Sequence, residues 1–160
     1  MATDIFLKID DVKGESKDRA HAGEIDVLAW TFGGANSGST HMGSGAAAGR
    51  VDIQDLSLTK YIDKSSPILM LACCAGKHYR TAKLTVRTAG ERPIDFLVME
   101  MTDLIVTSVS VGGSGGEDRL TENVTLDFAK FKYSYTPRKP DGTADAVVSM
   151  GWDIVRNQPA

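Results

Sequence analysis

The residues best suited to metal binding or nucleophilic catalysis are few: His21, His41, His78, Cys73 and Cys74. Cys74 and His78 are four residues apart, so on a continuing helix they would share a face and could form a thiol–imidazole pair. Gly76 lies between them and is expected to end that helix. Two ligands are also too few for a closed zinc site. The sequence therefore predicts no metal, no cofactor and no catalytic residue.

The two cysteines are neighbours in the chain, and a disulfide between neighbours closes a strained ring. They lie within the apolar run Ile68–Ala75. We therefore expect free, buried thiols that pack as small hydrophobic groups. The absence of a disulfide framework is typical of a protein made in a reducing compartment.

Two glycine-rich segments invite a nucleotide-binding interpretation, and neither fits it. Gly43-x-Gly45-x-x-Ala48 has the spacing of a dinucleotide fingerprint, but a strand and not a helix is expected after it. Gly112–Gly116 has no following lysine of the kind that a phosphate loop needs. The segment of residues 33–49 is either a flexible loop or an arm that becomes ordered on another subunit. The segment of residues 112–116 is predicted to be a hairpin loop.

Composition narrows the class of protein further. The 160 residues suit one domain, 42% of them are hydrophobic and 24% are charged, as in an ordinary globular chain. The net charge of −3 gives no general basic surface for nucleic acid or anionic lipid. The first ten residues are interrupted by charges, so we expect no signal peptide, and no run is long enough to insert into a membrane.

Most of the chain is predicted to be β-strand. Runs of apolar and β-branched residues are separated by Gly, Pro, Asn and Asp clusters, and Asp141-Gly142 is a strong turn signal. The predicted strands are residues 3–9, 24–32, 51–61, 82–88, 94–111, 122–136 and 146–155. The expected fold is therefore mainly β.

One helix is predicted over residues 66–75. Ser65 or Ser66 can cap it, Pro67 suits its first turn, and Gly76 suits its C-terminal cap. The helix is apolar on every side, so one sheet cannot cover all of it. A second covering surface, such as another subunit, is implied. We take three of its residues as candidates for the subunit interface or the core: Leu69, Met70 and Cys73.

The apolar positions of three strands change parity, which moves their side chains from one face of a sheet to the other. Odd positions give way to even ones between Val27 and Leu28 and between Ile53 and Leu56, and the reverse change occurs between Phe128 and Phe131. Bulges at the corners of a barrel explain this pattern, and so do strand ends buried against a partner. Parity alone leaves both explanations open.

A series of short motifs in order along the chain resembles the haemolysin-coregulated protein (Hcp) family of the type VI secretion system. The motifs are Gly14-Glu-Ser-Lys-Asp18, His21, Glu24-Ile-Asp-Val27, Trp30, Ser66-Pro67, Cys74-x-Gly76-Lys-His78, Ala82-Lys-Leu84, Arg87-x-Ala-Gly90, Ser108-Val-Ser110, the Gly112–Gly116 loop, Glu122-x-Val-x-Leu126, Tyr135-Thr-Pro137, Asp141-Gly142 and Gly151-Trp-Asp153. The doubled Cys73-Cys74 is a departure, because the motif needs only one cysteine.

The resemblance implies a single tube domain over residues 1–160, built as a β-barrel of two antiparallel sheets with one short α-helix alongside. It implies a homohexameric ring, with rings stacked into a tube that a contractile sheath propels. The implied partners are further copies of the chain, sheath and baseplate or spike proteins, and small effector proteins held in the lumen. The chain would be made in the cytoplasm and secreted to the extracellular space or into target cells by this system.

Two sets of residues are candidate contacts within such a tube. The first glycine-rich segment is expected to mediate ring stacking, with Asn36, Ser39, His41 and Met42 as candidate contacts. His41 and Met42 are its only bulky residues. The second segment is expected to face the lumen and its effectors, at Gly113, Ser114 and Gly115. The alternative is a secreted effector, carrier or chaperone without a structural role in the tube.

Overall fold

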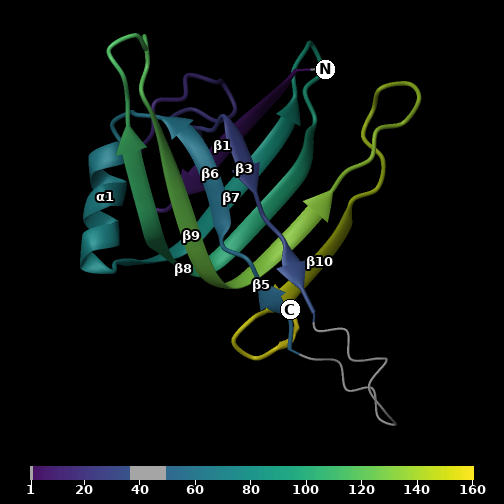
Figure 1. Ribbon diagram of the computed structural model, residues 1–160. Helices are drawn as coiled ribbons and strands as arrows, with labels where there is room; N and C mark the ends of the chain where they lie inside the picture. The colour runs from purple at the N-terminus through teal and green to yellow at the C-terminus, as the bar shows by residue number, and fades with distance from the viewer. Residues whose placement is uncertain (1, 37–49) are drawn as a thin grey trace.

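The computed structural model describes residues 2–36 and 50–160, and within them the chain is mainly β with one helix, α1 (Ser66–Ala75) (Figure 1). The strands follow the predicted runs closely, and the two-residue strands β4 and β11 were not predicted. The strands are β1 (Thr3–Ile9), β2 (Ile25–Asp26), β3 (Ala29–Thr31), β4 (Gly34–Ala35), β5 (Asp52–Ile53), β6 (Leu56–Tyr61), β7 (His78–Thr88), β8 (Asp95–Gly112), β9 (Thr121–Tyr135), β10 (Val148–Asp153) and β11 (Gln158–Pro159).

Most of the strands form a closed antiparallel barrel, and β4 and β5 pair with each other as a separate two-stranded sheet. β9 pairs with β8 along one edge, and its other edge pairs first with β6 and then with β10. β8 continues through β7 and β1 to β2, while β6 continues to β3. The two ends meet because Val27 N–H donates to Ile5 O at 3.0 Å and the next residue, Leu28, donates to Thr59 O at 2.8 Å. The parity change predicted between Val27 and Leu28 is thus a barrel corner.

A second change of parity runs across three neighbouring strands in one row. In each strand the buried residues switch parity at the same level: Tyr79 to Ala82 in β7, Met101 to Leu104 in β8, and Phe128 to Phe131 in β9. Asp103 lies in this row with φ 53°, a left-handed conformation. The row divides the β8–β9 hairpin into a half that pairs with β6 and a half that pairs with β10.

Because Asp103 is exposed and left-handed, its backbone should decide the effect of substitution there. We expect Asp103→Val to lower the free energy of unfolding by about 1–2 kcal/mol, since a β-branched residue is strained at positive φ. Asp103→Gly should introduce none of this strain and should not lower the free energy of unfolding through it. Urea unfolding of both variants measures the difference, and equal stabilities would show that the left-handed backbone is not constrained at this position.

Helix α1 begins and ends where the sequence predicts. Pro67 lies in its first turn, and Gly76 caps its C-terminus at φ 62° with its N–H donating to Ala72 O. The predicted side-chain cap is wrong for Ser65, because its hydroxyl donates to Asp63 Oδ1 at 2.5 Å and makes no cap hydrogen bond. Across residues 2–36 and 50–160, no helix has the length and apolar character needed to span a bilayer.

The core fills the barrel and extends under α1. It is mainly aliphatic, with Leu7, Leu56, Leu84, Met99 and Leu126 all fully buried. The mainly β barrel with one short α-helix alongside is therefore confirmed. The expectation of two buried thiols is wrong for Cys74, which is exposed on the outer side of α1, while Cys73 is half-buried against the core.

Candidate assembly surfaces

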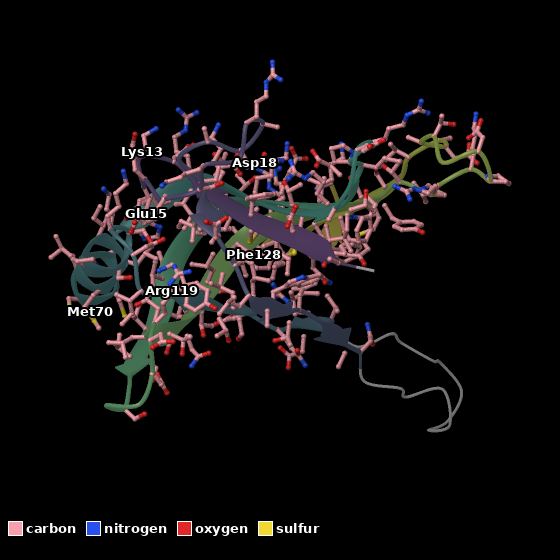
Figure 2. All side chains as sticks on the ribbon, turned by 90° about the horizontal axis from the view of Figure 1, so that it is seen from above. Lys13, Glu15, Asp18, Met70, Arg119 and Phe128 are labelled. Atoms are coloured by element: carbon pink, nitrogen blue, oxygen red, sulfur yellow. The ribbon has the colours of Figure 1, made fainter. Side chains whose placement is uncertain are left out.

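The outer side of α1 is apolar and uncovered. Leu69 and Ala72 face the barrel and are buried, whereas the opposite side exposes a continuous apolar stripe that we call the α1 face. Figure 2 places Met70 at the outer margin of the helix and Phe128 in the interior of the barrel. Leu71 is 68% exposed, which is unusual for so large an apolar side chain in a helix. The α1 face consists of Pro67, Ile68, Met70, Leu71 and Cys74.

The three helix residues singled out from the sequence are thus separated by the fold. Leu69 is fully buried and belongs to the core. Cys73 packs against the core at the edge of the buried side. Met70, 39% exposed, is the one of the three that lies on the α1 face.

A buried charged cluster fixes the start of α1 against the barrel. Lys60 on β6 and Glu122 on β9 are opposite each other in register, form an ion pair through Nζ and Oε1, and are both fully buried. Ser66 Oγ donates to Glu122 Oε1 at 2.6 Å, and Lys60 Nζ lies 3.1 Å from Asp63 Oδ1. Two strands and the first helical residue therefore share one network.

This cluster was not predicted from the sequence, although a signal for it exists. Lys60 follows Leu56 and Leu58 at period two, and Glu122 precedes Val124 and Leu126 in the same way. Period two places each charge on the buried face of its strand. Two opposite charges on the buried faces of two strands are each expected to need a partner, which points to a pair.

A second uncovered apolar surface lies where β9 and β10 extend beyond the barrel. On one face of these strands Val148 is opposite Tyr135, and Met150 is opposite Tyr133. Towards the barrel this face is closed, since Met99 and Phe131 are buried, but Val148 is 66% and Met150 48% exposed. We call the uncovered part, with Tyr133, Tyr135, Val148 and Met150, the β10 face.

The β10 face is hollowed where β3 and β5 cross beside it. A hollow of about 280 Å³ is lined by aromatic and aliphatic side chains and by one glycine: Trp30, Phe32, Gly34, Ile53, Phe131, Tyr133 and Met150. A neighbouring hollow of about 340 Å³ shares Ile53, Phe131 and Met150. No charged side chain lines either hollow among the residues that the structure describes.

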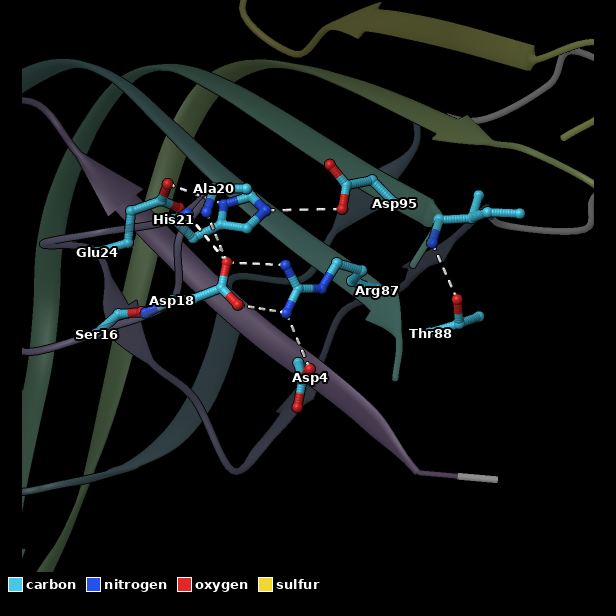
Figure 3. Close-up of polar contacts among 10 residues, drawn as sticks. Asp4, Ser16, Asp18, Ala20, His21, Glu24, Arg87, Thr88 and Asp95 are labelled. Atoms are coloured by element: carbon cyan, nitrogen blue, oxygen red, sulfur yellow. Dashed lines mark hydrogen bonds and ion pairs between the residues drawn. The ribbon is translucent and has the colours of Figure 1, made fainter. Parts of the chain in front are cut away.

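A polar cluster on the opposite side of the sheet holds down the segment between β1 and β2 (Figure 3). Arg87 on β7 donates two hydrogen bonds to Asp18, at 2.8 and 2.6 Å, and one to Asp4 at 3.1 Å. His21 lies between Glu24, 2.9 Å away, and Asp95, 3.6 Å away, and its ring stacks on Phe6. The motif residues Asp18 and His21 therefore anchor a loop.

The Arg87 guanidinium lowers the pKa of Asp18 to about 2, through the hydrogen bonds it donates and with help from the backbone N–H groups of Ala20 and His21. The folded pKa lies below the ordinary value of 3.8, so the carboxylate stabilises the fold above that value and loses this contribution as the pH falls towards 2. Asp18→Asn should therefore lower the unfolding temperature at pH 7, and the difference from the parent should shrink below pH 4.

Thermal unfolding between pH 2 and pH 7 measures this loss, with Asp118→Asn in an exposed loop as the matched control. A stability difference for Asp18→Asn that is the same at pH 2.5 and pH 7 would contradict the role of the charged pair.

The structure describes all of the second glycine-rich segment and only the start of the first. Gly113, Ser114 and Gly115 lie in the exposed loop that joins β8 to β9, as predicted for a hairpin loop. Asn36 is exposed just after β4. The other candidate stacking residues, Ser39, His41 and Met42, lie outside the described residues.

The possible chemical sites do not assemble. Gly76 ends α1 between Cys74 and His78, and His78 begins β7, so the two do not share a helical face. Within residues 2–36 and 50–160, no three His, Cys, Asp or Glu side chains cluster as metal ligands would. What the surface offers instead is two apolar patches, the α1 face and the β10 face.

Comparison with known proteins shows what kind of chain carries these patches. A family model described as "Type VI secretion system effector, Hcp" matches residues 6–135. The chain is 59% identical to the protein Hcp1 of Pseudomonas aeruginosa, over the full length of both. It belongs to the Hcp family.

Solved structures agree with this membership. A structure of a type six secretion system protein matches with a TM-score of 0.94 at 28% identity, covering 99% of this chain and 100% of the other. The crystal structure of Hcp1 from Salmonella typhimurium matches with a TM-score of 0.80 at 35% identity, with both chains fully covered. Because the chain belongs to this family, it is a type VI secretion protein. Hcp proteins are structural secretion proteins and not a known enzyme family.

Proposed function

We propose that this Hcp-family chain is the tube subunit of a type VI secretion system. Six copies form a ring, and rings stack into a tube that a contractile sheath expels from the cell. The partners of the tube are the sheath and the baseplate or spike proteins. The observation that supports this most directly is the pair of uncovered apolar surfaces. A ring of identical subunits needs two different patches on each copy, and the α1 face and the β10 face are two such patches.

The exposure of these patches is more than a monomer normally tolerates. Leu71, Val148 and Met150 are each about half exposed or more, and each lies beside other exposed apolar residues. Contiguous apolar patches on a soluble protein mark interaction surfaces. Figure 1 shows α1 on one side of the barrel and β10 on the other, which is the arrangement that a head-to-tail ring requires.

Electron microscopy of the purified protein tests the ring. We expect round particles with a central opening, and stacked particles as the protein concentration rises. Compact particles without an opening at every concentration would contradict the proposal.

Within the ring, we assign the loop that contains Gly113, Ser114 and Gly115 to the lumen, where small effectors bind. The loop is exposed, and its small side chains leave backbone groups open to a passing protein. Ser114→Gln should lower the amount of effector that co-purifies with rings severalfold, while rings persist. A Glu117→Gln control, in the same loop, should keep normal loading. Normal loading in Ser114→Gln would place the effector contact elsewhere.

Ring stacking is assigned to the segment that starts at Asn36, with His41 and Met42 as its bulky residues. Its support is the sequence together with the exposed position of Asn36 after β4. Met42→Asp should abolish stacked particles and leave single rings. Long tubes formed by that variant would contradict the assignment of ring stacking to this segment.

A further inference from the structure

The α1 face and the β10 face have complementary shapes and the same chemistry. One is the convex side of a helix, the other a hollowed sheet surface with aromatic walls. Residues 66–75 contain no charged side chain, and none lines the two hollows among the described residues. A partner with charged groups on its contact surface would lose their hydration on either face without gaining a partner.

Each face is also half of a standard two-layer arrangement. A sheet with an apolar face is stable when a helix or a second sheet covers it, and a helix with an apolar stripe needs a sheet or helix in return. On its inner side, α1 packs on β8 with Leu69 and Ala72, which covers that side of the helix. The other side of the helix and the end of the β9–β10 sheet are left without their second layer.

We infer that α1 of one copy docks on the β10 face of the next copy, with Leu71 and Cys74 directed at Met150 and the hollow behind it. The inference rests on the proposed ring and names its contact surfaces. Because α1 and β10 lie on opposite sides of the barrel (Figure 1), every copy uses α1 towards one neighbour and β10 towards the other. Such a head-to-tail contact closes into a ring when its rotation is right.

The buried Lys60–Glu122 pair gives the contact a fixed geometry. Ser66, the first residue of α1, is bonded to Glu122 on β9, so the helix is held to the same long strand whose far end forms the β10 face. The pair is therefore a positioning device for the docking helix, and Lys60 and Glu122 themselves do not enter the contact, since both are fully buried.

Cys74 makes the inference testable by disulfide formation between copies. In a Cys73→Ala background, Met150→Cys places the second thiol in the β10 face, and Ser149→Cys is the matched control. Ser149 directly precedes Met150 in the same strand, is exposed, and points to the opposite face of the sheet. Mild oxidation followed by non-reducing electrophoresis shows how many copies become linked.

We expect Met150→Cys to give a ladder that extends beyond dimers, because each copy has one cysteine for each neighbour, and Ser149→Cys to give at least tenfold less linked product. A ladder that stops at dimers would indicate a two-fold contact and overturn the inference. Equal linking in both variants would also overturn it.

A second pair guards against poor thiol geometry. With both natural cysteines replaced by alanine, Leu71→Cys and Ile53→Cys are combined in one chain. If the unmodified protein forms rings and neither cysteine pair forms a disulfide between copies, the docking assignment is wrong but the proposed ring is not. This result is expected if another segment of the same chain covers the β10 face. If the unmodified protein forms no ring, the proposed function fails and the docking assignment with it.

Discussion

Glu122→Ala is expected to lower the free energy of unfolding by about 3–5 kcal/mol, because it leaves the Lys60 ammonium buried without its main partner. This is a large share of the roughly 5–15 kcal/mol that stabilises a typical domain. Ser66 would also lose the acceptor of its hydroxyl, which loosens the start of α1. Urea unfolding followed by circular dichroism measures the loss.

The double variant Lys60→Met with Glu122→Leu separates a buried unpaired charge from a general loss of packing. Two apolar side chains of similar volume should restore most of the stability, to within about 2 kcal/mol of the parent. A double variant as unstable as Glu122→Ala would show that packing around β6 and β9, and not the unpaired ammonium, sets the cost.

Leu71→Glu is expected to abolish the ring while leaving the fold of each copy intact. Leu71 is 68% exposed in the single chain, so a charge there costs little in the monomer. In the docked state the carboxylate would be buried against an apolar hollow without a partner, at a cost of several kcal/mol at each contact. A penalty of about 3 kcal/mol already weakens an association more than a hundredfold.

Sedimentation velocity at increasing concentration measures this effect, and Leu71→Met is the matched control. The control keeps the apolar character and approximate volume of the side chain, so its rings should persist. Rings of normal size in Leu71→Glu would exclude α1 from the subunit contact.

The parts of the fold that could be predicted are those that depend on local chemistry. Pro67 and Gly76 bracket α1 because a ring-locked φ suits the first turn and a left-handed glycine suits the cap. The Asp141-Gly142 turn forms where predicted, with Gly142 at φ 89°. The corner at Val27 and Leu28 coincides with a predicted change of parity, and a barrel corner is one of the two explanations that parity allowed there.

The parts that could not be predicted depend on contacts between distant segments. In the β8 run from residue 95 to 112, both parities are apolar over residues 96–99 and again over residues 104–106, which obscures the change of parity at Asp103. The inner and outer sides of α1 are equally apolar, and only the packing of Leu69 on the barrel distinguishes them. The β10 face is invisible in the sequence, because Val148 and Met150 have the pattern of an ordinary half-buried strand.

The measurement that tests the central claim most directly is the native mass of the purified chain. A self-assembling tube subunit should give a species of about six times the 17.2 kDa chain mass, with multiples of it as rings stack. A single 17.2 kDa species at every concentration would contradict the claim, because the α1 face and the β10 face would then be uncovered without a partner.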